Sequence, residues 1–318
     1  MVHAFSSARE SFLVLIDPIL GRKGGAWTDI FMRLQGKLFA RLQLDSFEDE
    51  LDALFDALGD QMPTTLQWTY IAITCISSLY QYGRKDSRLR EALRQGRREK
   101  REAEVEEPLQ TEEPGDGDAI LPSSPVNDHV RPERPNIEAL PQKFYNIPFE
   151  IRSQDQDDIP VAKIVFDKAC HLSFSLLSES LNIGTEVEIQ TFVHIWLAFF
   201  SYVLRYPPVV QLFERKVPWQ ELADWINDIA SNLVCTGWTC DPHQLAELEM
   251  DKRMLPEDVH MQGFDWSRKL FPKDWFENID ILEGLPETEK TEVARMKRLI
   301  LLGVQITKVL LKICRCLM

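Results

Sequence analysis

The residues best suited to bind a metal ion are two cysteines and a histidine in the C-terminal half. Cys235, Cys240 and His243 offer thiolate and imidazole groups, which zinc prefers. A closed structural zinc site needs four ligands, however, and the sequence shows no obvious fourth ligand beside this loose Cys-x4-Cys spacing. We therefore interpret these residues as reduced thiols and a histidine in a loop, and we predict no metal and no other cofactor.

Catalytic motifs are equally weak. The glycine-rich segment GRKGG at residues 21–25 lacks the Gly-Lys-Ser/Thr ending and the preceding strand of a phosphate-binding loop. The chain contains no HExxH motif and no Gly-x-Ser-x-Gly elbow. His194 lies in the most apolar segment with no acid or nucleophile near it in sequence, so we interpret it as a hydrogen-bonded core residue. We predict that the protein is not an enzyme.

A dense basic segment is the best candidate for contact with phosphates. Nine basic and three acidic residues lie between Arg84 and Arg101, and the next seventeen residues contain eight acids and no base. One hypothesis is that Arg94, Arg97, Arg98 and Arg101 bind RNA or DNA. The alternative is a solvated, charged helix, which the absence of interleaved aromatic residues favours.

Composition limits the remaining function classes. The 318 residues carry a net charge of −14, so a surface wholly devoted to nucleic acid is excluded and any such contact must be local. Six cysteines without regular spacing indicate reduced intracellular thiols. The apolar stretch 192–204 is too short to cross a bilayer, and Lys308, Lys312 and Arg315 interrupt the stretch 299–318. We expect no membrane contact.

Helical periodicity marks both halves of the chain. In the first half the apolar positions are Phe31, Leu34, Leu38 and Leu42, then Phe47, Leu51, Leu54, Phe55 and Leu58, followed by an apolar helix over 64–82. In the second half they are Phe166, Cys170, Ser173, Leu177 and Leu181, a buried helix over 186–205, then Trp219, Leu222, Ala223, Ile226, Ala230 and Leu233, and finally Met296, Leu299, Gly303, Ile306, Leu310, Ile313 and Leu317. No segment shows sustained strand alternation.

These patterns predict an all-α protein built of stacked antiparallel helical hairpins, similar to a tetratricopeptide-type α-solenoid, although no clean 34-residue period exists. Eight prolines between residues 108 and 148 and a shortage of large apolar side chains predict disorder over about 107–157. The predicted organisation is a first helical part at 1–83, a charged helix or helix extension at 84–106, the acidic, proline-rich disordered insertion at 107–157, and a second helical part at 158–318.

Three segments resemble one known family. FMRLQGKLFARL at residues 31–42 resembles the "F-x-R-L-H-G-x-L-F-T" helix of the ever-shorter-telomeres and SMG-type nonsense-mediated decay factors, with Gln35 in place of the usual histidine. SARESF at residues 7–12 resembles the family's opening element, "T-A-R-E-S-L". LPEDVHMQGF at residues 255–264 resembles its "L-P-E-D-x-x-L-R-G-F" signature. The fungal branch is closest, because residues 274–276 and 294–303 follow in the expected order.

The resemblance implies a helical DNA/RNA-binding domain of telomerase-associated and decay factors, with RNA or single-stranded telomeric DNA and decay or telomerase proteins as partners, in the nucleus or cytoplasm. It implies structural roles for the motif residues Arg33, Leu34, Gly36, Phe39, Leu255, Pro256, Glu257, Asp258, Gly263 and Phe264. We expect Pro256 to start a helical turn, the two acids to meet its exposed N–H groups, and Gly263 to allow close backbone approach before Phe264 packs inward.

Two parts of that family have no counterpart in this sequence, namely the 14-3-3-like phosphopeptide-reading fold and the C-terminal PIN nuclease domain. Gln262 also stands where the family commonly has arginine, which removes one potential phosphate contact. Two hypotheses therefore remain open: a non-catalytic nucleic-acid-binding adaptor, and a protein–protein interaction scaffold without nucleic-acid binding.

Overall fold

The computed structural model describes residues 26–106, 158–235, 253–268, 270–271, 275–276 and 288–317. Within these ranges the chain forms α-helices and short 3-10 turns and no strands, so the predicted all-α class is confirmed. The predicted disordered insertion at 107–157, the opening element at 7–12, the loop at 21–25, and Cys240 and His243 lie outside the described residues. Regular stacking into a solenoid stays a prediction.

The first half contains a helical hairpin, a central helix and a charged helix. Helix α3 (Ala26–Ala40) packs against α4 (Phe47–Asp60), which follows the 3-10 turn η1 (Leu44–Ser46). Helix α5 (Thr65–Leu79) begins at a capping box in which Thr64 and Gln67 satisfy each other's backbone N–H groups. The turn η2 (Gln81–Gly83), with positive φ at all three residues, separates α5 from α6 (Arg88–Glu106). Helix α6 is therefore a separate helix and not an extension of α5.

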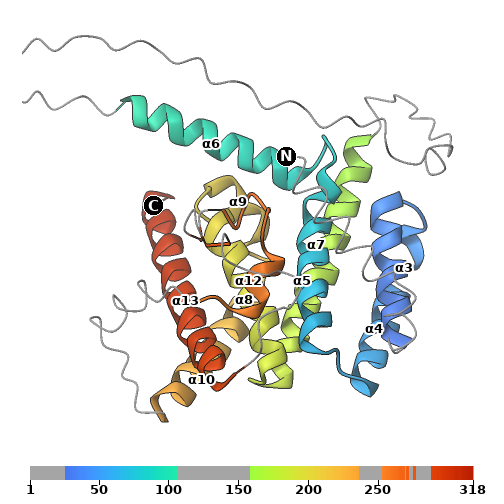
Figure 1. Ribbon diagram of the computed structural model, residues 1–318. Coiled ribbons are helices and arrows are strands. Elements are labelled where there is room, and N and C mark those ends of the chain that lie inside the picture. The colour runs from blue at the N-terminus through green and yellow to red at the C-terminus, as the bar shows by residue number, and fades with distance from the viewer. Residues whose placement is uncertain are drawn as a thin grey trace, which may run out of the picture.

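The second half comprises α7 (Asp158–Ile183), α8 (Val187–Val203), α9 (Pro207–Phe213), α10 (Trp219–Cys235), the short α12 (Pro256–His260) and α13 (Glu289–Leu317). Helix α8 packs against both α5 and α13, so helices far apart in sequence form the centre of the molecule. In Figure 1 the α3–α4 hairpin and α13 stand at opposite sides, and α6 lies across the top.

The core is aromatic and centred on α8. Every residue of α8 from Ile189 to Val203 is buried, as predicted for this apolar segment. The ring of Trp196 lies 5.7 Å from that of Phe174 in α7 and 5.6 Å from that of Phe200. Such tilted aromatic pairs add specific ring contacts to the burial of apolar area, which is the main force holding these helices together.

Two details of the predicted apolar faces are wrong. Leu42 is 64% exposed, because α3 ends at Ala40 and the chain turns through a positive φ at Arg41. In α10 the residue Ala223 is exposed, while Trp225 and Ile229 are buried. The buried stripe of α10 is thus formed by Leu222, Trp225, Ile229 and Leu233. Helices α3, α4 and α7 bury the other predicted positions as expected, with Phe55 and Leu58 partly buried.

Candidate functional site

The family-like signature at residues 255–264 forms the corner that contains α12. Pro256 occupies the first turn of this helix, as its fixed φ favours. Asp258 accepts a hydrogen bond from the backbone N–H of Leu255 at 2.9 Å and so caps the turn. Gly263 has a φ of +87°, so glycine is needed for its left-handed conformation, and Phe264 then packs inward with 5% exposure. The expected capping role therefore holds for Asp258.

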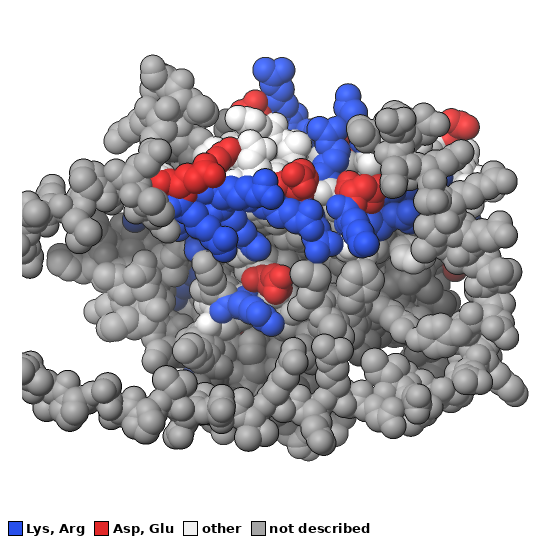
Figure 2. Space-filling view, turned by 90° about the horizontal axis from the view of Figure 1, so that it is seen from above, with Lys and Arg blue, Asp and Glu red and all other residues white. Residues whose placement is uncertain are grey.

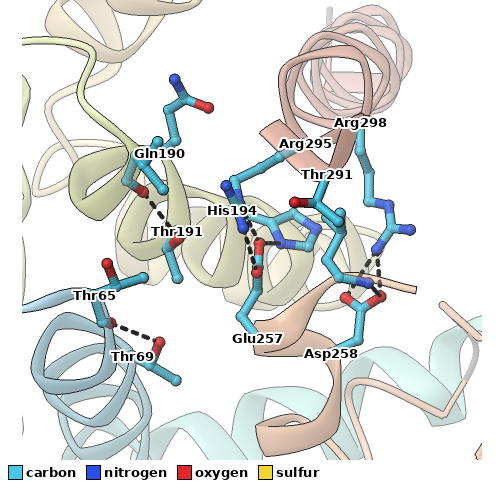
Figure 3. Close-up of polar contacts among 12 residues, drawn as sticks. Thr65, Thr69, Gln190, Thr191, His194, Glu257, Asp258, Thr291, Arg295 and Arg298 are labelled. Carbon is cyan, nitrogen blue, oxygen red and sulfur yellow. Dashed lines mark hydrogen bonds and ion pairs between the residues drawn. The ribbon is translucent and has the colours of Figure 1, made fainter. Parts of the chain in front are cut away.

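Glu257 does not cap the helix as expected; it forms the centre of a buried charged cluster (Figure 3). Its Oε1 accepts a hydrogen bond from Nε of Arg295 in α13 at 2.6 Å, and its Oε2 accepts one from Nη2 at 3.0 Å. His194 of α8 lies on the other side, with Nδ1 2.9 Å from Oε1. All three side chains have no exposed surface, so α8, α12 and α13 meet at one carboxylate.

A second ion pair stands beside the first. Asp258 accepts from Nη1 of Arg298 at 2.8 Å and 2.7 Å through its two oxygens. Arg298 also donates from Nη2 to the backbone carbonyl of Arg253 at 2.6 Å. Two successive acids of the signature are thus each matched by an arginine one turn apart on α13, a geometry that holds α12 against that helix.

The electrostatics of Glu257 follow from these contacts. Burial alone would raise the pKa of this carboxyl, but the hydrogen bonds and charges of His194 and Arg295 outweigh burial and hold the pKa well below its usual range. Glu257 is therefore an ionised acceptor. Its two oxygens meet one histidine and one arginine, so this arrangement holds three helices together, while Nε2 of His194 is buried without a hydrogen-bond partner.

Sequence reasoning identified His194 as a core residue, and the structure confirms that interpretation. It missed the partner, because Glu257 lies 63 residues away and no local spacing reports the contact. It also noted an arginine-containing stretch at 294–303 without pairing Arg295 or Arg298 with the two acids. The available signal was that residues 255–264 contain two acids and residues 294–303 contain two arginines, each pair within a family-like motif.

The motif in α3 is likewise a packing element. Leu34 is fully buried, whereas Arg33 is exposed and its Nε stands 3.6 Å from Oε2 of Glu50 in α4. The stronger link comes from Lys37, which sequence reasoning did not single out. Its Nζ donates to Oγ of Ser46 at 2.6 Å and lies 2.8 Å from Oε1 of Glu50, so this lysine fastens the α3–α4 hairpin.

Gln35, at the position where the motif that residues 31–42 resemble has histidine, is also completely buried. Its side-chain oxygen accepts a hydrogen bond from the hydroxyl of Tyr82, and its Nε2 lies 3.8 Å from Sγ of Cys75. Burial raises the pKa of the Cys75 thiol to about 12, which keeps it protonated and unreactive. Phe39 contacts the ring of Tyr82 edge-on at 5.2 Å, and a Cβ on Gly36 would meet no atom within 4 Å. The motif therefore positions α3 against the α5–α6 turn.

The four arginines of the candidate nucleic-acid interface all lie on α6, but in two different settings. The first half of α6 packs on the body through Leu89, Ala92, Leu93 and Gly96, whereas residues 97–103 are all exposed. Helical spacing places Arg94, Arg98 and Arg101 on one outward-facing line, which we call the basic edge. Figure 2 shows that this upper face carries Lys and Arg side chains in a band, with Asp and Glu side chains among and beside them.

Arg97 has a different role from the basic edge. Its Nη2 donates to the hydroxyl of Tyr202 in α8 at 2.5 Å. Next to it, Gly96 lies so close to Tyr206 that an added Cβ would stand 2.7 Å from the Cβ of that residue. These two neighbours anchor α6 where it crosses the body, so Arg97 is better described as a positioning residue.

The remaining surface features carry less chemistry. An open groove of about 720 Å³ lies between α7 and the α9–α10 turn, and it is lined by positively charged side chains, negatively charged side chains and Trp219.

In the described part of the chain, no helix has the length and apolar character needed to span a bilayer.

Comparison with known proteins finds no similar protein. No protein-family model matches the chain, and neither a curated protein nor a solved structure matches it. The resemblance to the telomere and decay factors therefore stays an expectation from the sequence motifs alone.

Proposed function

We propose that this chain is a non-catalytic helical adaptor that binds RNA or single-stranded DNA through the basic edge of α6. The observation that carries the proposal is the placement of Arg94, Arg98 and Arg101. They lie four and three residues apart on a helix whose opposite side is buried, so all three are exposed on one face, where Arg94 also forms an exposed ion pair with Glu91 at 3.6 Å. Phosphate contacts by exposed arginines supply most of the affinity of non-specific nucleic-acid binding.

The interior of the protein supports the non-catalytic part of the proposal. In the described part of the chain, Glu257, His194 and Arg295 form a buried charged cluster in which each side chain contacts another helix. The resemblance of residues 31–42 and 255–264 to telomerase-associated and decay factors supports the class of partner. On that basis we propose a role in RNA surveillance or telomere maintenance, in the nucleus or the cytoplasm, together with protein factors of those pathways.

A protein–protein interaction scaffold is the second candidate. The net charge of −14 and the exposed Gln262, at a position where the family commonly has arginine, both reduce attraction to phosphate. In this case the basic edge of α6 would be only a solvated helix surface.

Fluorescence-anisotropy titration separates the two candidates. The purified chain is titrated against labelled single-stranded RNA and single-stranded telomeric-repeat DNA at several salt concentrations. The adaptor proposal expects binding at low salt that weakens with a slope of about −2 in log K against log salt, from three phosphates at about −0.7 each. Absence of binding at low salt favours the scaffold.

A further inference from the structure

The groove between α7 and the α9–α10 turn combines an apolar floor with free polar groups. Cys170, Phe174 and Val217 form the floor and are at most 6% exposed. On the wall formed by α7, the hydroxyls of Ser175 and Ser178 make no hydrogen bond within the part of the chain that the structure describes. The groove's volume of about 720 Å³ falls within the usual range of ligand sites. The groove can therefore bury an apolar group and still satisfy polar groups beside it.

The opposite wall carries an aromatic ring that is held from behind. Trp219 is half-buried, its ring centroid lies 5.4 Å from that of Phe200, and its Nε1 donates to the backbone carbonyl of Glu214 at 3.1 Å. Pro218 beside it is half-buried as well. The ring is therefore fixed in position, and its accessible part lines the groove as a surface for a proline or aliphatic side chain.

Two charges at the groove are available to a ligand. Arg215 is 92% exposed, and its Nε stands 3.9 Å from Oε1 of Glu214, which is a weak, solvated pair. Glu221 is exposed and forms no ion pair with any described residue. The other ionisable side chains of the two walls are paired, Lys216 with Asp167 and His171 with Glu48. One free cation and one free anion thus flank Trp219.

The free cation and the free anion lie toward opposite ends of the groove. Lys216 contacts Asp167, and Trp225 donates to the carbonyl oxygen of Gly184 at 2.7 Å. The chain over 215–225 therefore runs beside α7 in the same direction as α7, with the cation before the anion. The α7 wall at 167–178 is about 16 Å long, which about five residues of an extended peptide match.

From these features we infer that the groove binds an extended peptide of a partner protein in which a proline or aliphatic residue stands between an acidic and a basic residue. The central residue packs on Trp219 and the apolar floor, the acid pairs with Arg215, and the base pairs with Glu221. The two serine hydroxyls meet backbone amide groups of the peptide.

Charge complementarity selects this occupant. A uniformly acidic peptide or a row of phosphates would meet repulsion at Glu221, and a uniformly basic peptide would meet it at Arg215. The groove belongs to α7, α9 and α10, so this inference is independent of nucleic-acid binding by α6.

The test is an anisotropy titration of the full chain with labelled hexapeptides. The mixed peptide is Glu-Ala-Leu-Pro-Ala-Lys. Two like-charged peptides carry glutamate at both ends or lysine at both ends, and a fourth peptide has Ser-Gly in place of Leu-Pro. The proteins are the wild type, Arg215→Glu and Glu221→Lys. The controls Arg268→Glu and Asp52→Lys make the same charge changes at exposed positions of other elements.

The wild type is expected to bind the mixed peptide about three- to tenfold more tightly than either like-charged peptide, because each mismatch exchanges an exposed attraction for a repulsion. Arg215→Glu should transfer the preference to the peptide with two lysines, and Glu221→Lys to the peptide with two glutamates. Both controls should keep the wild-type preference. Loss of stability alone cannot produce such an exchange of preference.

The Ser-Gly peptide should bind the wild type at least about threefold more weakly than the mixed peptide, because contact with Trp219 is lost. Absence of saturable binding of the mixed peptide would overturn the inference. Unchanged preferences in Arg215→Glu and Glu221→Lys, or equal affinity for the Ser-Gly peptide, would overturn it as well.

Discussion

Glu257 of α12 and Arg295 of α13 form an ion pair with two contacts, at 2.6 Å and 3.0 Å, and neither side chain has any exposed surface. His194 completes the cluster from α8. Charges buried this deeply are stable only when they are matched, since an unmatched buried charge carries a large desolvation cost. The pair therefore makes the position of α12 depend on α8 and α13 together.

Removing the charge of Glu257 should strongly destabilise the fold. Glu257→Gln leaves Arg295 as a buried, uncompensated cation, so we expect the free energy of unfolding in urea to fall by about 3–5 kcal/mol. Glu179→Gln, which changes an exposed glutamate of α7, is the control and should stay within about 0.5 kcal/mol of the wild type. A Glu257 variant as stable as this control would show that the cluster does not hold the helices.

The same carboxyl predicts a dependence of stability on pH. Contacts with His194 and Arg295 lower the pKa of Glu257 below its ordinary value of 4.5 in the folded state. The stability it contributes is thus fully present above that value and is lost as the pH falls toward the folded-state pKa. Urea unfolding of the wild type and Glu257→Gln across the acidic range should show the two proteins converging as pH drops. A difference that stays constant down to the acid limit would contradict this origin.

The contact of Gly96 with Tyr206 gives opposite predictions for two helical glycines. Gly96→Ala would place a Cβ 2.7 Å from the Cβ of Tyr206, and overpacking of this kind costs about 1–3 kcal/mol. Gly36→Ala in α3 meets no atom within 4 Å and should stabilise the protein by about 0.5–1 kcal/mol through helix propensity. Urea unfolding measures both. Equal stabilisation by both substitutions would mean that α6 does not dock as closely as described.

The periodicity of apolar residues was sufficient to predict the helices, because burial of one face determines which positions are apolar. It was insufficient where contacts between helices distant in sequence decide which face of a helix is buried. Residues Leu222 to Leu233 fit more than one apolar stripe: Trp225 and Ile229 are buried, whereas Ile226 of the predicted stripe is half-buried and lies close to Gly303 of α13. Leu42 was misplaced because the sequence carries no glycine or proline to mark the end of α3.

The candidate site could likewise be predicted only in part from the sequence. The basic run was visible in the sequence because its charges are contiguous. The different role of Arg97 was not, since Tyr202 lies 105 residues away and belongs to a helix whose orientation only packing defines. The matching of Glu257 and Asp258 to two arginines on α13 was hidden for the same reason, although both signature acids had been singled out.

A double-mutant cycle tests the anchoring role of Arg97. Arg97→Gln and Tyr202→Phe each remove the same hydrogen bond and should each lower stability by about 1 kcal/mol. Because they remove one interaction, the double variant should cost little more than either single variant in urea unfolding. Tyr202→Phe should leave the salt dependence of nucleic-acid binding nearly unchanged. Additive losses would show that the two side chains act independently.

The most direct test of the proposed function is the salt dependence of single-stranded RNA binding in two charge-matched triple variants. Arg94→Gln/Arg98→Gln/Arg101→Gln removes the basic edge, and Lys163→Gln/Arg215→Gln/Arg268→Gln removes three exposed charges from other elements. We predict that the first variant loses about two from the magnitude of the slope of log K against log salt, which is nearly the whole wild-type slope, together with most of its affinity, while the second keeps the wild-type slope. An unchanged slope and affinity in the basic-edge variant would contradict the account.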